Sequence, residues 1–296
     1  FAQPDADGVW QGFDVAVCRA VAAAVLGDGS AVEFVPTTGK TRFTSLASGE
    51  IDMLARNTTW TFSRDVDLKF EFTGVNYYDG QGFMVKKDTG ITSSKSQDID
   101  GVTVCIQTGT TTELNLADHF RTVGMSYEPL PVESGSEAVT QYLAGACDMF
   151  TTDASALAAR RANFENPNDH VLLPEIISKE PLGPLVRHGD NNWGDVVRWT
   201  LNALITSEEL GVTSGNIEEM SKGTNNPEMN RLLGSEGNLG EMLGLDADWA
   251  KRAIMVGGNY GEIFENNIGS GTIIGLARGL NAQWTDGGLI YSPPFR

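Results

Sequence analysis

Short strand-like and helix-like segments alternate between residues 14 and 173 of this 296-residue chain, and this alternation constrains the fold more than any other feature. The helix-like segments carry apolar residues at helical spacing, and the strand-like segments are short apolar runs bounded by turn residues. Such alternation is typical of parallel sheets covered by helices on both faces. The length corresponds to about two domains. We therefore expect an α/β fold with two doubly wound domains.

The pattern locates the individual elements. We expect helices at residues 14–26, 41–48, 111–123, 136–144, 154–163 and 192–207. We expect strands at residues 32–35, 51–54, 82–85, 102–106, 125–130, 147–151 and 171–173. Residues 210–296 are Gly-rich and helix-like with no clear strand. Their apolar side chains, such as Trp249, Ile254, Met255, Ile263 and Phe264, predict that this region packs on the body of the protein.

Composition and charge exclude several classes of protein. Acidic residues number 39 against 21 basic ones, so the net charge of −18 would repel a nucleic acid. The best apolar run, residues 15–26, is interrupted by Arg19 and is too short to span a membrane. Three cysteines and three histidines have no zinc-site spacing, and we expect no metal and no cofactor. The chain begins at Phe1 without an apolar leader, as expected of a mature or trimmed product.

Three polar segments follow predicted strands, where ligands of such sheets bind. The first, residues 55–65, contains hydroxyl and amide side chains and ends in Arg64 and Asp65. A guanidinium is a planar, two-pronged donor for a carboxylate, and hydroxyls bond a second oxygen or an ammonium. Taken alone, the segment also fits an ordinary solvated loop. Trp60 and Phe62 within it fit either the core or the wall of a pocket.

The second segment, residues 107–113, reads Gln-Thr-Gly-Thr-Thr-Thr-Glu. Thr110 and Glu113 have the spacing of a capping box, which predicts a helix that opens at Thr111. Amide N–H groups at a helix N-terminus, together with the helix dipole, favour an anion. An ordinary capped turn between a strand and a helix is the alternative.

The third segment, residues 148–155, places Asp153 where a strand again precedes a helix. Its carboxylate is either an N-cap, the commoner use of Asp at this position, or the partner of a cation such as an ammonium. Together the three segments supply an arginine, a helix start that favours anions, and an acid. This combination is the complement of a zwitterion.

Competing catalytic motifs are incomplete. Gly39-Lys40-Thr41 resembles the end of a phosphate-binding loop, but Phe34 stands where that motif requires Gly. No Gly-x-Ser-x-Gly elbow is present, and no His lies near a Ser or Cys in the three polar segments. His119 falls inside a predicted helix, where a surface or packing role is commoner. We therefore expect a binding protein without covalent catalysis.

Several stretches together resemble the polar-amino-acid solute-binding proteins of bacterial ABC importers. They are residues 12–15 (Gly-Phe-Asp-Val), 49–52 (Gly-Glu-Ile-Asp), 57–64, 107–111 and 147–153. Residues 259–264 and 279–284 are similar to the long C-terminal tail of the general L-amino-acid subfamily. The resemblance implies a periplasmic receptor that captures an L-amino acid and delivers it to the ABC permease in the inner membrane. We expect it to be a monomer.

The resemblance also implies an architecture, the type II periplasmic-binding-protein fold. Two doubly wound lobes are joined by two crossover strands and close on a ligand in the cleft. Lobe 1 is expected at residues 1–83 and 187–296, with a helical C-terminal extension, and lobe 2 at residues 84–186. The crossovers are expected near residues 80–86 and 184–187.

Roles for single residues follow from the resemblance alone. It implies that Arg64 grips the α-carboxylate, with Thr59 and Asn57 beside it, and that Asp153 holds the α-ammonium. The expected contacts from the second lobe are Gln107, Gly109, Thr110 and Thr111, with Gln107 facing the cleft. The resemblance does not indicate which amino-acid side chain is preferred.

One feature departs from the resemblance. Family members begin with a β-strand and a loop ahead of the Gly-Phe-Asp segment. Phe13 and Asp14 come so early here that this strand has no counterpart. We expect either a trimmed N-terminus or a first lobe that is built differently. Ligand contacts from that strand, and any partner that it holds for Cys18, stay unassigned.

Two other functions use related scaffolds. The main alternative is an enzyme such as a cyclohexadienyl-type dehydratase, which requires a general acid beside the leaving hydroxyl. The sequence offers no such acid besides Asp153. The sensor module of a membrane receptor is a third reading, and it requires a transmembrane segment that this chain lacks.

Cys105 and Cys147 are expected to form a disulfide. Cys105 lies in the first predicted strand of lobe 2, and Cys147 opens the strand after the next strand–helix unit. In a doubly wound sheet these strands are neighbours, and a bridge requires Cα atoms about 4.4–6.8 Å apart. Such a bond persists in an oxidising compartment like the periplasm. Two buried free thiols on adjacent strands are the alternative.

Overall fold

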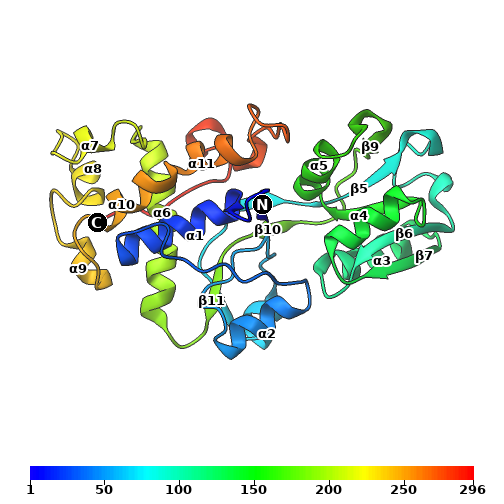
Figure 1. Ribbon diagram of the computed structural model, residues 1–296, viewed down its shortest axis with the longest axis horizontal. Coiled ribbons are helices and arrows are strands. Elements are labelled where there is room, and N and C mark those ends of the chain that lie inside the picture. The colour runs from blue at the N-terminus through cyan, green and yellow to red at the C-terminus, as the bar shows by residue number, and fades with distance from the viewer. The chain divides into compact units, whose positions relative to one another are not determined.

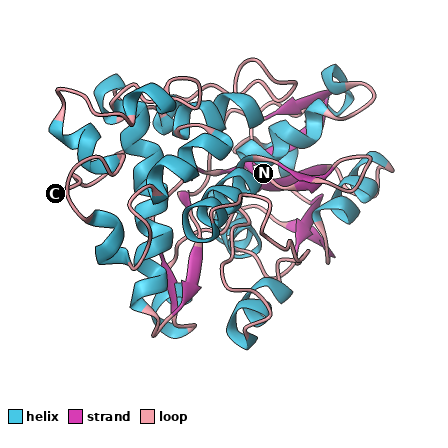
Figure 2. Cartoon of the chain, turned by 60° about the vertical axis from the view of Figure 1, so that its left-hand side comes forward, coloured by secondary structure: helices cyan, strands magenta, loops and turns pink.

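The computed structural model describes residues 1–296, and the chain divides into two compact units. Unit 1 comprises residues 1–35, 52–77 and 182–296, and unit 2 comprises residues 36–51 and 78–181. Figure 1 labels their helices and strands, and Figure 2 shows that the strands are short and that helices and loops make up most of the chain. None of the helices combines the length and the apolar composition that crossing a bilayer requires.

Unit 2 contains a five-stranded sheet. Its strands are β5 (Gln81–Lys86), β6 (Val102–Gln107), β7 (Tyr127–Val132), β8 (Met149–Asp153) and β9 (His170–Leu172). Their order is β7-β6-β8-β5-β9, with β6 parallel to β7 and β8, and β5 antiparallel to β8 and β9. The helices of unit 2 are α2 (Thr41–Ser48), α3 (Thr111–Val123), α4 (Gly135–Leu143) and α5 (Ala154–Ala162). The sheet is mixed rather than wholly parallel because β5 runs against β8.

Side chains alternate between the two faces of this sheet, because successive residues of a strand point to opposite sides. Phe83 of β5 packs in one cluster with Phe120 of α3. Met84, the next residue, packs in a second cluster with Tyr142 of α4 and Leu157 of α5. Helices therefore cover both faces, and β6 and β8 lead directly into α3 and α5.

The expected disulfide between Cys105 and Cys147 is confirmed. Cys105 lies in β6, and Cys147 is separated by Asp148 from the start of β8, the parallel neighbour of β6. The two Cα atoms are 5.6 Å apart. Cys18 remains a free thiol in unit 1. Burial, and secondarily the Asp14 carboxylate, raise the pKa of the Cys18 thiol to about 12, which keeps it protonated.

Unit 1 is mainly helical and is arranged around α1 (Phe13–Leu26). This helix packs against α6 (Asn191–Glu209), α10 (Trp249–Gly257) and α11 (Tyr260–Asn267), as Figure 1 shows. It ends at Gly27, whose φ of 77° is the left-handed conformation that commonly terminates helices. The alanines of α1 are nearly all buried, and their small side chains let the neighbouring helices approach.

The strands of unit 1 are short and antiparallel. β1 (Gln3–Pro4) pairs with β2 (Trp10–Gln11), and β3 (Phe70–Phe72) pairs with β11 (Leu185–Arg187). Leu54 adds one isolated bridge to Leu185. The doubly wound parallel sheet expected for lobe 1 is therefore not formed.

Two strand predictions in unit 1 are wrong. Residues 32–35 form no strand, and residues 51–54 contribute only the Leu54 bridge. A strand requires a hydrogen-bonded neighbour, and no strand runs beside residues 32–35. An apolar run predicts an extended segment but does not reveal whether a partner strand exists.

The chain passes between the units at residues 35–36, 51–52, 77–78 and 181–182. The strands at the last two passages, β4 (Tyr77–Asp79) and β10 (Glu180–Leu182), pair with each other. The crossovers predicted near residues 80–86 and 184–187 are displaced, because β5 belongs to the sheet of unit 2 and β11 pairs within unit 1. Residues 36–51 group with unit 2. The lobe boundaries given by the resemblance stay a prediction.

Residues 210–296 are helical and contain no strand, in agreement with the sequence pattern. Besides α10 and α11, their helices are α7 (Ile217–Met220), α8 (Pro227–Leu232) and α9 (Leu239–Leu243). Trp249, Ile254, Ile263 and Phe264 are buried, whereas Met255 is exposed. The predicted packing of this tail on the body is confirmed by the contact of α10 with α1.

Removing the disulfide should lower the free energy of unfolding by about 4 kcal/mol, because the bond restricts the unfolded chain. The linked residues are 42 positions apart. We expect the double variant Cys105→Ser, Cys147→Ser to unfold at a lower urea concentration, measured by tryptophan fluorescence. Cys18→Ser is the matched control and should leave the midpoint near that of the wild type. Three reactive thiols in the denatured, unreduced protein would contradict the bridge.

Candidate functional site

Arg64 is held in place within unit 1 by its own segment. Its side chain is only 6% exposed, and its Nη1 donates to the Thr59 carbonyl at 2.8 Å. It lies in a single π-helical turn, Ser63–Asp67, a feature that is frequent at functional sites. Thr58 and Thr59 are also buried, so the solvated-loop alternative does not describe this part of the segment.

The backbone of the same segment is anchored to the return passage of the chain. Gly183 N donates to the Thr58 carbonyl at 3.1 Å, and Thr59 forms a bridge with Leu182. The Thr58 hydroxyl donates to the Arg56 carbonyl at 2.8 Å. These bonds fix the position of the carbonyl that Arg64 contacts.

Asn57 has an uncommon backbone conformation, with φ of 26°. Its N–H donates at 2.8 Å to the carboxylate of Asp14, which also accepts from Asn76 Nδ2 at 3.1 Å. Asp14 is 2% exposed, and burial raises its pKa, while the donors from Asn57 and Asn76 act in the opposite direction. The sequence alone indicates no role for Asp14, although it belongs to the Gly-Phe-Asp stretch.

The two aromatic residues of the segment are not part of the core. Trp60 is 40% exposed and stacks on Phe72 with ring centroids 5.5 Å apart. Its Nε1 donates to Asp65 at 2.6 Å. Phe62 is 82% exposed. Unit 1 therefore displays one anchored and one unpacked aromatic ring next to Arg64.

In unit 2, the predicted capping box at the start of α3 is formed only in part, because Thr110 caps the helix but Glu113 bonds Gly109 N rather than Thr110 N. Glu113 N donates to the Thr110 hydroxyl at 3.3 Å, and the Glu113 carboxylate accepts from Gly109 N at 2.9 Å. Gly109 has φ of 72°, and a Cβ there would lie 2.8 Å from Lys40 Cγ, so glycine is required. The turn therefore presents the helix N-terminus in a fixed geometry.

The polar side chains of this turn are engaged within unit 2. Thr110 Oγ1 donates to the Gln107 carbonyl at 2.7 Å, and Gln107 Nε2 donates to the Glu133 carbonyl at 3.1 Å. Thr111 Oγ1 donates to Glu180 Oε2 at 3.0 Å. Main-chain N–H groups, which lack partners inside a helix at its N-terminus, are the donors that this turn offers to an anion.

Asp153 ends β8 and occupies the N-cap position of α5, but its side chain makes no capping bond. Asp79 serves this helix start instead, because it accepts from Ser155 Oγ and, at 3.4 Å, from Ser155 N. The simple N-cap alternative for Asp153 is therefore wrong. The Asp153 carboxylate is 5% exposed.

Glu180 is a second buried acid of unit 2, only 1% exposed. Besides Thr111, it accepts hydrogen bonds from Asn115 Nδ2 at 2.7 Å and from Ser178 Oγ at 2.6 Å. Asp79 and Glu180 were missed by the sequence analysis. Each is an isolated acid in a short strand, and only Gly80 after Asp79 signals a turn.

Gln81 lies opposite Asp153 in the pairing of β5 with β8. Its Nε2 donates to the Thr112 carbonyl at 3.0 Å and to Thr151 Oγ1 at 2.9 Å. Its Oε1 is buried and has no hydrogen-bond partner in the protein. An unsatisfied buried acceptor is costly, so this oxygen suits a water molecule or the N–H of a ligand.

The candidate site residues thus form two groups, one in each unit. Unit 1 supplies a buried arginine, and unit 2 supplies a helix N-terminus and buried acids. His119 has no part in either group, because its Nε2 bonds the Ser94 carbonyl at 2.7 Å and its ring packs on Phe83. The packing role expected for His119 is confirmed.

The stability of unit 2 should depend on the protonation of Asp79. Burial raises the pKa of Asp79 from 3.8 to about 6; nearby Glu180 acts in the same direction, and hydrogen bonds from Ser155 and Gly80 oppose the shift. A raised native pKa favours the protonated form, so this stabilisation is present below about pH 4 and is lost as the pH rises through about 6.

Asp79→Asn should therefore flatten the dependence of the unfolding free energy on pH between about 4 and 6. Urea titrations at a series of pH values measure this slope. The control is Asp67→Asn, at an exposed position of unit 1, which should keep the wild-type slope. An unchanged slope in Asp79→Asn would contradict the assignment.

Known proteins resemble this chain along its whole length. The glutamate/glutamine/aspartate/asparagine-binding protein BztA of Rhodobacter capsulatus is 64% identical over 296 residues, covering 100% of this chain and 87% of that protein. The general L-amino acid-binding periplasmic protein AapJ of Rhizobium johnstonii is 54% identical, covering 100% and 86%. A periplasmic binding protein from Brucella ovis, solved with glutathione bound, is 55% identical with a TM-score of 0.96, covering 100% of this chain and 92% of that one.

A family model also matches this chain. The model of the bacterial extracellular solute-binding proteins, family 3, matches residues 1–214. This range includes every candidate site residue described above, from Asp14 to Glu180. The chain therefore belongs to the bacterial extracellular solute-binding proteins, family 3.

Proposed function

We propose that this protein is the solute-binding component of an ABC importer, which captures free L-amino acids in the periplasm and delivers them to an inner-membrane permease. The observation that carries the proposal is the separation of buried charge, with Arg64 in unit 1 and Asp153 in unit 2. A free amino acid carries the complementary pair, a carboxylate and an ammonium. A guanidinium suits a carboxylate, and a carboxylate suits an ammonium, so the two residues match the two ends of the amino-acid head group.

We assign the ligand contacts as follows. Arg64 binds the α-carboxylate, and the backbone at Thr59 and Asn57 borders it. Asp153 accepts from the α-ammonium. The helix start of unit 2 adds main-chain donors, with the turn shaped by Gln107, Gly109, Thr110 and Thr111. The internal bonds of these side chains support a role in fixing the turn rather than in direct contact.

The names of the relatives favour recognition of the amino-acid head group. They include a protein named for four acidic and amide amino acids, one named for L-amino acids in general, and one solved with glutathione. Glutathione carries a free α-carboxylate and α-ammonium on its glutamyl end. We therefore infer that the head group is held strictly and that the side chain is tolerated broadly.

Binding without turnover fits the arrangement of the acids. Asp79 has the raised pKa that a general acid requires, but its carboxylate is occupied by Ser155 and Gly80. It holds the start of α5. No observation favours the dehydratase alternative.

Arg64→Ala should nearly abolish binding of L-glutamate in titration calorimetry. Removing one member of a buried ion pair costs about 3–5 kcal/mol, because the remaining charge is left unpaired. Arg121→Ala is the control, since Arg121 is exposed and pairs only with Asp118 of its own helix. A loss of affinity smaller than about fivefold, or ~1 kcal/mol, would remove Arg64 from the site.

Asp153→Asn should weaken L-glutamate strongly and glutarate, which lacks the ammonium, much less. The reason is that only the ammonium of glutamate interacts with the Asp153 carboxylate. Asp118→Asn, at an exposed position of α3, is the control and should change neither affinity. Equal losses for both ligands would contradict the assigned role of Asp153.

A further inference from the structure

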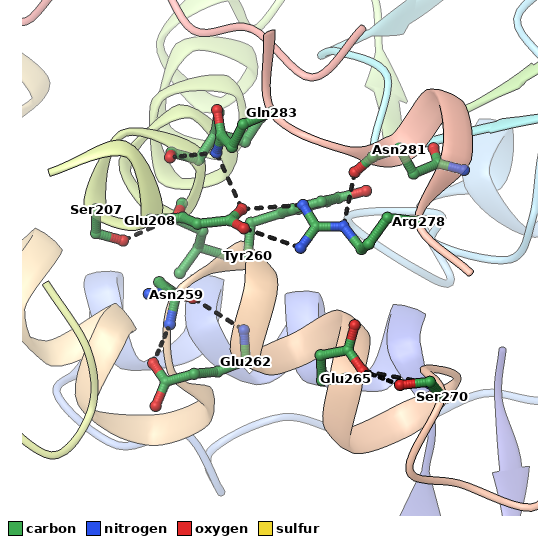
Figure 3. Close-up of polar contacts among 12 residues, drawn as sticks. Ser207, Glu208, Asn259, Tyr260, Glu262, Glu265, Ser270, Arg278, Asn281 and Gln283 are labelled. Atoms are coloured by element: carbon green, nitrogen blue, oxygen red, sulfur yellow. Dashed lines mark hydrogen bonds and ion pairs between the residues drawn. The ribbon is translucent and has the colours of Figure 1, made fainter. Parts of the chain in front are cut away.

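The segment after residue 214 lies outside the match to the family model, so its role is not explained by the family. An ion pair between Arg278 and Glu208 joins this segment to α6. Arg278 Nη1 and Nη2 bond the Glu208 carboxylate at 2.8 and 3.1 Å, and Arg278 Nε donates to the Asn281 carbonyl at 2.8 Å. Figure 3 shows the guanidinium of Arg278 facing Glu208, with Tyr260 beside it. A two-pronged, partly buried pair of this kind is stronger than a surface ion pair.

Further bonds hold the extension against α6. Gln283 Nε2 donates to the Ile205 carbonyl at 3.0 Å and to Glu208 at 2.9 Å. At the start of α11, Asn259 and Glu262 form a capping box, and Asn259 Nδ2 donates to the Val212 carbonyl at 2.8 Å. Figure 3 shows Gln283 beside Glu208, and Asn259 beside Glu262. The position of α11 on unit 1 is therefore well defined.

The buried face of α11 carries aromatic rings that contact Phe13 of the Gly-Phe-Asp stretch and Tyr77 of β4. The Phe13 ring lies 5.9 Å from that of Tyr260 at an interplanar angle of 88°. The Phe264 ring stacks on Tyr77 at 6.2 Å and 5°. The Arg278 guanidinium lies 5.2 Å from the Tyr260 ring and 5.0 Å from the Phe264 ring. The ion pair with Glu208 thus also orients the two rings.

A chain of buried hydrogen bonds leads from this face to the candidate ligand segment. Tyr260 OH donates to the Asn76 carbonyl at 2.8 Å, and Asn76 Nδ2 donates to Asp14 at 3.1 Å. The other oxygen of Asp14 accepts from Asn57 N at 2.8 Å. Asn57 holds a positive φ, a conformation that persists only when its surroundings enforce it.

We propose that the C-terminal extension positions the ligand-binding segment, and that Tyr260 is the positioning residue through which it acts. The inference rests on the proposed function in that it assigns regulation of the same site. Tyr260 holds Asn76, whose side-chain amide holds the Asp14 carboxylate, and Asp14 holds the backbone of Asn57.

Tyr260→Phe is the sharpest test, because it removes only the hydroxyl and leaves the aromatic packing. We expect about a three- to tenfold loss of affinity for L-glutamate, the range of one buried hydrogen bond. Amide hydrogen exchange of residues 55–65 in the ligand-free protein should accelerate, while that of α3 in unit 2 should not. Tyr291→Phe, at an exposed tyrosine of the same extension, is the matched control and should change neither quantity.

The outcomes separate positioning from general stabilisation. Unchanged exchange in residues 55–65, faster exchange throughout the protein, or unchanged affinity would each overturn the proposal. A double-mutant cycle with Asp14→Asn adds a second criterion, since two members of one network are non-additive and independent sites add. Additive losses would overturn the relay. If the wild type binds no amino acid, the proposed function fails, and the local exchange rates still decide the role of Tyr260.

Discussion

The carboxylate of Asp14 is almost inaccessible to water, and much of unit 1 is arranged to supply its hydrogen-bond donors. A buried carboxylate is tolerated only when its oxygens are bonded, so Asn57 and Asn76 must stay in place. These residues come from the start of α1, the candidate ligand segment and the chain just before the passage at residues 77–78. One buried acid side chain therefore links these three parts of unit 1.

Unit 2 also contains buried acids whose oxygens accept hydrogen bonds. Asp79 bonds the start of α5, which leaves Asp153, at the N-cap position, without a capping task. Glu180 collects donors from Thr111, Asn115 and Ser178. The sheet positions these groups, because β6 and β8 are neighbouring strands that end before α3 and at Asp153. Asp153 therefore occupies the N-cap position without capping α5.

Local signals predicted what local interactions determine. The bounds of α2 and α3 agree with the sequence pattern, because Gly49 and the Thr110–Glu113 pair mark their ends. Residues 32–35 were wrongly predicted as a strand, since pairing depends on a distant segment. Asp79 and Glu180 were missed for the same reason: their partners Ser155 and Thr111 lie 76 and 69 positions away. The disulfide was predictable because strand order follows from the strand–helix alternation.

The Cys105–Cys147 bond joins β6 to the chain just before β8, and these two strands lead to the helix start of α3 and to Asp153. Because it links β6 to β8 covalently, the spacing of these strands does not depend on the side chains at their tips. Substitutions that alter ligand preference commonly destabilise a protein, and a domain with a covalent cross-link tolerates more of them. The bridge therefore makes this face of unit 2 a place where new specificities can evolve without loss of the fold.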